Sequence, residues 1–139
     1  MKQVVISEQI EALARDTINA ALTVHRALGP GLLESTYHQC LVIELNHLGV
    51  SVEREKILPL TYRNQTIETA YRLDLLVGGL LLVELKACEI LLPIHHAQVV
   101  TYLKLSRLPL GLLINFNVPL IKNGITRVLN LDFQTEVPA

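Results

Sequence analysis

One segment of the chain is apolar almost throughout and yet contains an aspartate, a glutamate and a lysine. Residues 71–86 read Tyr-Arg-Leu-Asp-Leu-Leu-Val-Gly-Gly-Leu-Leu-Leu-Val-Glu-Leu-Lys, with a glycine pair at the centre. Apolar runs on both sides of such a pair predict two largely buried β-strands joined by a short loop. Charged groups are seldom buried unless they are paired or bind a metal, so Asp74, Glu84 and Lys86 need a chemical reason to lie here.

The length of the glycine loop decides whether these charges meet. Side chains alternate between the two faces of a strand, so Glu84 and Lys86 share a face. A two-residue loop would place Asp74 opposite Val83, whereas a loop of three or five residues centred on Gly79 places it opposite Glu84. Three-residue hairpin loops with a left-handed glycine are common, and the apolar residues of the two strands also match in that register. We therefore predict the odd loop, with two carboxylates and one ammonium group meeting across the strand pair.

Such a cluster suits metal-dependent phosphodiester hydrolysis. Mg²⁺ takes one or two protein carboxylates together with water and phosphate oxygens. The cation polarises the phosphate and acidifies a bound water, and a lysine can position that water or stabilise the developing charge. The alternative is an ordinary ion pair across two strands on a solvated face, because such pairs are frequent in sheets. Spacing alone leaves both interpretations open.

The periodicity of the remaining sequence predicts a mixed α/β fold. Apolar residues at alternating three- and four-residue steps indicate helices, and continuous or alternating apolar runs indicate strands. A strand, a helix and a strand in succession suggest a parallel crossover within a mixed sheet that helices cover. The predicted elements, in the order α-α-β-β-β-α-β-β, are helices 7–28 and 32–49, strands 52–62, 67–77 and 80–87, helix 93–106, and strands 110–116 and 125–129.

Length, charge and cysteine content narrow the class of protein. A chain of 139 residues fits one domain, residues 1–139, which buries roughly 70% of its unfolded surface. The net charge of −1 does not indicate a strongly basic nucleic-acid binder, although it leaves room for a local basic rim. Cys40 and Cys88 are too few for a disulfide framework, which predicts free thiols in the cytoplasm. We see neither a leader nor an apolar stretch of about 18 residues, and expect no membrane association.

Two predicted helices carry polar residues on faces that also bear apolar ones. Glu34 lies three residues before Tyr37 on helix 32–49, where it is either a partner of the helix dipole or a group that points into the site. On helix 93–106, His95, Gln98 and Tyr102 follow at steps of three and four residues and therefore share a face. Each of these residues taken alone is more often structural than functional.

Together these segments resemble a known family. Residues 31–37, Gly-Leu-Leu-Glu-Ser-Thr-Tyr, match the Gly-x-x-Glu-x-x-Tyr signature of the GxxExxY family, a branch of the PD-(D/E)XK nuclease superfamily. The likeness extends from residue 24 to residue 125. Asp74 with Glu84-x-Lys86 resembles the core motif of the superfamily, Glu34 its helical first carboxylate, and Gln98 the later glutamine of RecB-like branches. Leu73 stands before Asp74 where proline is frequent, but proline binds no metal, so no catalytic position is lost.

The resemblance implies a restriction-endonuclease-like sheet flanked by helices, with a nuclease site at one end. The cofactor would be Mg²⁺ or Mn²⁺, held by Glu34, Asp74, Glu84 and the backbone carbonyl of Leu85. Lys86 would orient or activate the attacking water, and Gln98 would support the site or touch phosphate. The residues expected around this centre are Tyr37, His25, His95 and Tyr102.

Three functions remain in competition at this point. The first is a metal-dependent nuclease that acts on DNA or RNA, with DNA the favoured expectation for its partner. The second is a catalytically silent module that binds nucleic acid or protein and keeps the fold, which the near-neutral charge and the scarcity of aromatic residues favour. The third is a structural protein whose apolar surface is completed in a homodimer. Intact Glu34, Asp74, Glu84 and Lys86 favour the nuclease, because clustered charges are costly to retain without a use.

Overall fold

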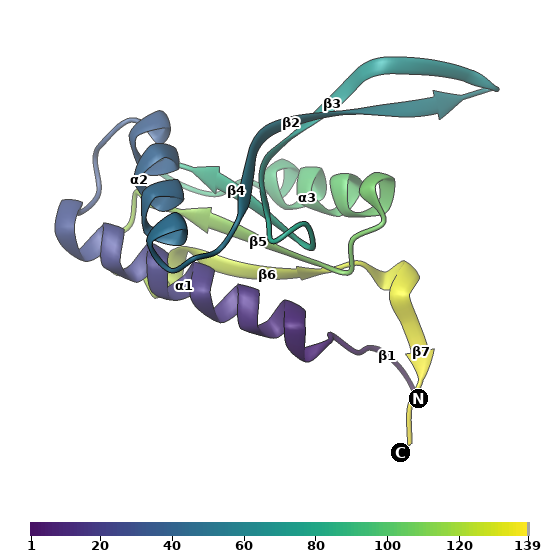
Figure 1. Cartoon of the computed structure of the whole chain (residues 1–139), viewed down its shortest axis with the longest axis horizontal. Coiled ribbons are helices and arrows are strands. Elements are labelled where there is room, and N and C mark those ends of the chain that lie inside the picture. The colour runs from purple at the N-terminus through teal and green to yellow at the C-terminus, as the bar shows by residue number, and fades with distance from the viewer. Residues whose placement is uncertain (139) are drawn as a thin grey trace.

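A computed structural model describes residues 1–138, in which helices cover a mixed five-stranded sheet (Figure 1). The predicted mixed α/β fold is confirmed. Across these residues, none of the helices combines the length and apolar character needed to span a bilayer. The helices are α1 (Glu8–Leu28), α2 (Glu34–His47) and α3 (Pro93–Ser106), with short 3₁₀ turns η1 (Ile121–Gly124) and η2 (Leu131–Phe133). The strands are β1 (Lys2–Val4), β2 (Val52–Tyr62), β3 (Gln65–Val77), β4 (Leu81–Lys86), β5 (Leu110–Asn115), β6 (Ile125–Leu129) and β7 (Gln134–Glu136).

The sheet has the strand order β2-β3-β4-β5-β6, and its faces are covered by different helices. Strands β4 and β5 are parallel, as the predicted crossover through α3 requires, while the other neighbours are antiparallel. Helices α1 and α2 pack on one face together with Leu75, Val83 and Leu85, whereas α3 packs on the other with Leu82 and Leu113. Alternation along β4 therefore directs Glu84 and Lys86 toward the α3 face.

The loop between β3 and β4 has the predicted odd length. Val77 pairs with Leu81, Leu76 with Leu82, and the last paired residues of the ladder bring residue 75 opposite residue 83. The loop therefore consists of residues 78–80, and the ladder ends at Leu75 and Val83, next to positions 74 and 84. Gly78 has a φ of 59°, and a Cβ at this position would come within 2.8 Å of the Leu13 side chain. The loop thus needs glycine for its backbone conformation, and a Cβ here would also displace the end of the Leu13 side chain.

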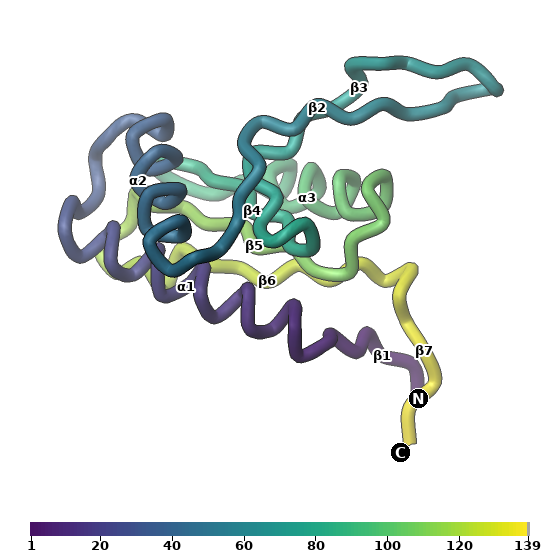
Figure 2. The backbone as a smooth tube through the Cα atoms, in the orientation of Figure 1, coloured from purple at the N-terminus to yellow at the C-terminus, as the bar shows by residue number. Residues whose placement is uncertain are grey.

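Strands β2 and β3 form a long hairpin that projects from the body of the molecule (Figures 1 and 2). Its turn is shorter than the four residues 63–66 that we predicted. Tyr62 pairs with Gln65, which leaves only Arg63 and Asn64 in the turn, with φ values of 48° and 63°. Two successive left-handed residues are the geometry of a type I′ hairpin turn. The hairpin bends where it leaves the body, at Glu55, whose φ is 49°.

The segment between α1 and α2 is held by a buried tyrosine. The Tyr37 hydroxyl donates to the Gly29 carbonyl at 2.6 Å and accepts from the Leu32 N–H at 3.1 Å. Its ring stacks on Phe116 with centroids 4.6 Å apart. These contacts fix where α2 begins, so the Gly-x-x-Glu-x-x-Tyr segment positions Glu34 at the first turn of a helix.

The ends of the chain add a small sheet that sequence analysis did not predict. Strands β1 and β7 pair antiparallel, with Lys2 opposite Glu136, and Figure 2 shows the two chain ends side by side. Cys40 and Cys88 are free thiols, as predicted.

Candidate active site

Two carboxylates lie where the ladder between β3 and β4 ends, and each is bonded to the backbone of the other strand. The Asp74 N–H donates to Oε1 of Glu84 at 3.1 Å, and the Leu85 N–H donates to Oδ2 of Asp74 at 2.9 Å. The side chains therefore take over the pairing that backbone carbonyls provide along the rest of the ladder. Glu84 is only 2% exposed. The predicted meeting of the two carboxylates is thus present and rigidly held.

The environment gives the two acids different pKa values. Burial, and then the negative charge of Asp74, raise the pKa of Glu84 to about 8. Burial also acts to raise the pKa of Asp74, but contacts with His38, the Leu85 N–H and Glu84 outweigh it, so this pKa lies below its ordinary value. Near neutral pH the pair consequently carries one negative charge, with a proton on Glu84.

Lys86 is oriented by a short polar chain on α3. Its Nζ donates to Oε1 of Gln98 at 3.3 Å, and Nε2 of Gln98 donates to the Tyr102 hydroxyl at 3.2 Å. The ring of Tyr102 in turn lies against Tyr71, with centroids 5.3 Å apart. Gln98 therefore contacts the ammonium group of the lysine directly, and Tyr102 contacts Gln98.

His38 is a neighbour of this site that sequence analysis missed. Its Nε2 lies 3.8 Å from Oδ1 of Asp74, which is an electrostatic contact longer than a hydrogen bond. The residue is 8% exposed, and its Nδ1 has no hydrogen-bond partner among the described residues. A signal for it was present in the sequence, because His38 follows Glu34 by four residues and so shares its helix face.

A pocket of about 150 Å³ opens beside Asp74. It is bounded by the first turns of α2 and by both strands of the projecting hairpin where they bend. Its lining residues are Glu34, Ser35, His38, Arg54, Glu55, Arg72 and Asp74.

Glu34 lies at this pocket but does not complete a group of three ligands. Its side chain is exposed at the start of α2. Within residues 1–138, no three histidine, cysteine, aspartate or glutamate side chains are gathered closely enough to hold a metal ion. The structure therefore brings Asp74 and Glu84 together and leaves Glu34 beside them.

The residues present nevertheless fit a hard divalent cation. Each carboxylate gives one oxygen to a backbone N–H, which leaves Oδ1 of Asp74 and Oε2 of Glu84 for other ligands. Burial, and then the charge of Asp74, raise the pKa of Glu84, so a cation beside the pair would favour its ionised form. Mg²⁺ needs only one or two carboxylates, completed by water and phosphate. Asp74, Glu84 and the Leu85 carbonyl would hold such an ion, with Glu34 within the same pocket.

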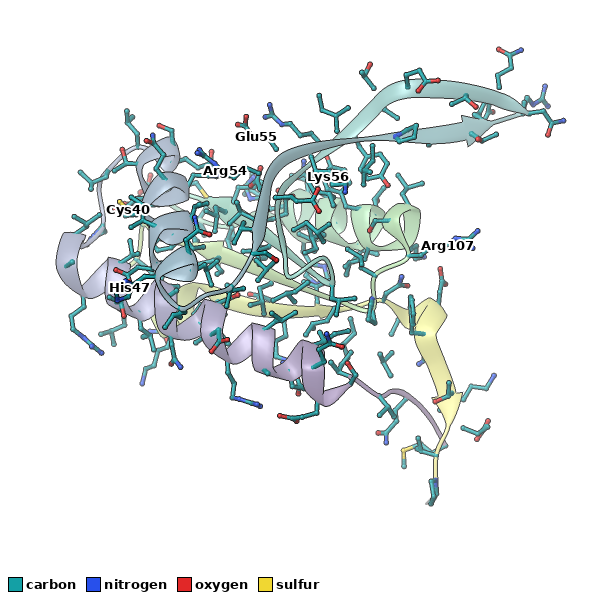
Figure 3. All side chains as sticks on the ribbon, in the orientation of Figure 1. Cys40, His47, Arg54, Glu55, Lys56 and Arg107 are labelled. Carbon is teal, nitrogen blue, oxygen red and sulfur yellow. The ribbon has the colours of Figure 1, made fainter. Side chains whose placement is uncertain are left out.

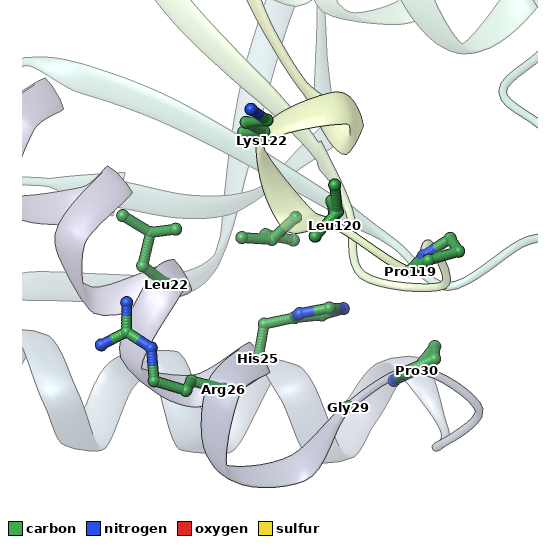
Figure 4. Close-up of a pocket in the computed structure, with 9 residues that line it drawn as sticks. Leu22, His25, Arg26, Gly29, Pro30, Pro119, Leu120 and Lys122 are labelled. Atoms are coloured by element: carbon green, nitrogen blue, oxygen red, sulfur yellow. The ribbon is translucent and has the colours of Figure 1, made fainter.

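The two histidines that we expected around this centre, His25 and His95, make their contacts elsewhere. Nδ1 of His95 accepts the Leu92 N–H at 3.0 Å and so caps the start of α3. His25 donates from Nε2 to the Val118 carbonyl at 2.7 Å, and it lines a larger cavity of about 510 Å³ between α1 and the segment that follows β5 (Figure 4). That cavity includes neither Asp74 nor Glu84, so its size does not make it the reactive site.

Comparison with known proteins gives one family match. The sequence matches the PD-(D/E)XK nuclease superfamily over residues 11–128, a range that extends from α1 into β6 and contains every carboxylate of the pocket. No curated protein and no solved structure matches the chain.

Proposed function

The chain belongs to the PD-(D/E)XK nuclease superfamily, whose members are mostly nucleases, and on that premise we propose that it hydrolyses phosphodiester bonds in DNA or RNA. The observation that carries this proposal is the pairing of Asp74 and Glu84 through reciprocal backbone bonds, with Lys86 two residues further along the same face. The Gly-x-x-Glu-x-x-Tyr segment at residues 31–37 further supports a place in the GxxExxY branch.

The proposed chemistry divides among these side chains. Asp74 and Glu84 would hold Mg²⁺ or Mn²⁺, which would supply Lewis acidity and an acidified water. Glu84 would serve as a ligand in its deprotonated form, because a metal ligand must be deprotonated. Lys86, oriented by Gln98, holds the attacking water or stabilises the charge that develops on the phosphate. Glu34 lies at the mouth of the same pocket, where it serves as an additional ligand through water.

A binding module without turnover is the second candidate. The exposed position of Glu34 favours it, because only two carboxylates are gathered in advance.

Two further expectations accompany either candidate. The free thiols of Cys40 and Cys88 agree with a cytoplasmic protein. Exposed apolar side chains such as Leu33 and Ile94 would suit contact with a second copy of the chain.

The proposal is tested with four proteins that are purified identically: the wild type, Glu84→Gln, Lys86→Ala and the control Glu68→Gln. Glu68 is an exposed glutamate on the outer part of β3, so its change is chemically matched to that at Glu84. Cleavage of labelled single-stranded DNA, duplex DNA and RNA is measured with Mn²⁺ or Mg²⁺. We expect it to fall by roughly 10²-fold or more in Glu84→Gln and in Lys86→Ala. The control should cleave as the wild type does, and circular dichroism should be unchanged in all four.

Other outcomes identify the competing functions. Equal cleavage in all four proteins would mean that the activity comes from a contaminant or from another site. Saturable Mn²⁺ binding that Asp74→Ala abolishes, without any cleavage by the wild type, would support the binding module. If no metal binds, the charges only pair with one another and the structural interpretation holds.

A further inference from the structure

Two arginines line the acidic pocket without a carboxylate partner. Arg54 on β2 and Arg72 on β3 both face the pocket that contains Asp74. The ion pairs formed within residues 1–138 include neither of them, although other arginines, such as Arg15 and Arg127, are paired. Both side chains are exposed, and Figure 3 shows Arg54 at the bend of β2, beside α2. Unpaired guanidinium groups next to a proposed phosphodiesterase centre call for an anionic ligand.

The bend of the hairpin is what brings the arginines to the pocket. In a regular strand, consecutive side chains point to opposite faces. Arg54 and Glu55 nevertheless both line the pocket, because Glu55 adopts the left-handed conformation with a φ of 49°. Arg72 on β3 lines the same pocket as Asp74. A left-handed conformation is uncommon for a residue such as glutamate, and strained backbone of this kind is concentrated at functional sites.

The start of α2 lines the same pocket. Leu33 is the N-cap and has no side-chain oxygen with which to accept an N–H of the first turn. Glu34 and Ser35 of that turn line the pocket, as does His38, whose buried Nδ1 has no partner among the described residues. Free N–H groups at a helix start attract anions. Residues of three elements, α2, β2 and β3, therefore line one small pocket.

We propose that Arg54 and Arg72 bind a backbone phosphate of the nucleic-acid strand and thereby place the neighbouring phosphodiester at Asp74 and Glu84. The identity of the ligand rests on the proposed function. Arginine suits this task because its planar fork donates two parallel hydrogen bonds to phosphate oxygens. Glu34 and Glu55 also line the pocket, and their negative charges offset those of the arginines. The nucleic-acid strand would therefore be held by directional hydrogen bonds and not by a broad positive field. A chain with a net charge of −1 can bind nucleic acid in this way.

Fluorescence anisotropy of labelled DNA tests the proposal. Binding of a short single strand, the corresponding duplex and an RNA of the same sequence is measured with EDTA, and also with Mg²⁺ in a Lys86→Ala background that keeps the probes intact. Arg54→Gln and Arg72→Gln should each weaken binding roughly tenfold. Each should also lower the slope of log K against log salt by about 1. Arg54→Lys and Arg72→Lys should keep the slope but bind less tightly than arginine, because lysine retains the charge without the fork.

Arg63→Gln is the matched control. Arg63 lies in the turn of the same hairpin and outside the pocket, and we expect its loss to change affinity by less than about twofold. The proposal is overturned if the double variant Arg54→Gln/Arg72→Gln binds as the wild type does, if Arg63→Gln weakens binding equally, or if the wild type binds none of the probes at low salt. Arginine-dependent binding without any cleavage would reject hydrolysis but keep the phosphate site. Normal cleavage with an unchanged KM in the double variant would keep hydrolysis and reject the phosphate site.

Discussion

The two halves of strand β3 have opposite environments although they belong to one continuous strand. In residues 73–77 the side chains of Leu73, Leu75 and Val77 are fully buried between the helices. In residues 65–69 every side chain is exposed on the projecting hairpin. The boundary lies between Arg72, which is exposed, and Asp74, which the backbone of β4 holds in place. The proposed metal site thus lies where the strand becomes buried, and the arginine proposed to contact nucleic acid lies where it becomes exposed.

Truncation of an apolar residue in each half gives the largest expected contrast in stability. Leu75 is 0% exposed and Ile67 is 48% exposed. Leu75→Ala leaves a cavity in the core and should cost about 2–5 kcal/mol, whereas Ile67→Ala should cost less than about 1 kcal/mol. Urea unfolding of the two variants measures both values. Equal losses in the free energy of unfolding would show that Ile67 is packed as tightly as the core, which would contradict the contrast between the two halves of β3.

The pH dependence of stability in the metal-free protein sharpens the comparison further, because it reports on the carboxylates at the boundary between the two halves. Glu84 keeps its proton in the folded state up to about pH 8, whereas the unfolded chain releases it near pH 4.5. The folded state therefore binds more protons between these values, and the free energy of unfolding should fall as pH rises through this range. The slope is at most about 1.4 kcal/mol per pH unit.

The two carboxyl groups of the site act in separate pH ranges. The pKa of Asp74 is lowered, so its contribution is lost only as pH falls below about 3.8. Glu84→Gln should flatten the decline in the free energy of unfolding between pH 4.5 and 8, while Glu68→Gln on the exposed half of β3 should leave this decline unchanged. Thermal unfolding across this range with EDTA measures the effect. A decline that persists in Glu84→Gln would assign it to another group.

The sequence predicted the part of the site that local rules determine. The apolar runs and the glycine pair gave the odd loop between β3 and β4, and the three- and four-residue steps of α3 put Gln98 and Tyr102 on one helix face, which the structure turns toward Lys86. These relations depend on strand alternation and helix periodicity, which are properties of neighbouring residues.

Features that depend on distant contacts were not predictable in this way. The left-handed Glu55 has no sequence signal of its own, because glycine or asparagine would be expected there, so the pocket and its arginines were missed. The pairing of β1 with β7 joins short, exposed segments from the two ends of the chain. Glu34 shares a helix face with Tyr37, but its place at the first turn leaves it exposed at the pocket mouth.

The central claim is that the paired carboxylates at the end of β4 bind a divalent cation. An anomalous difference map from a crystal soaked in Mn²⁺ tests it most directly. We expect a peak between Asp74 and Glu84, with carboxylate oxygens at roughly 2.0–2.6 Å, as for hard cations. A second map from Glu84→Gln crystals should lack the peak. A wild-type map with no manganese at these two residues, or with manganese only in the cavity at His25, would contradict the account.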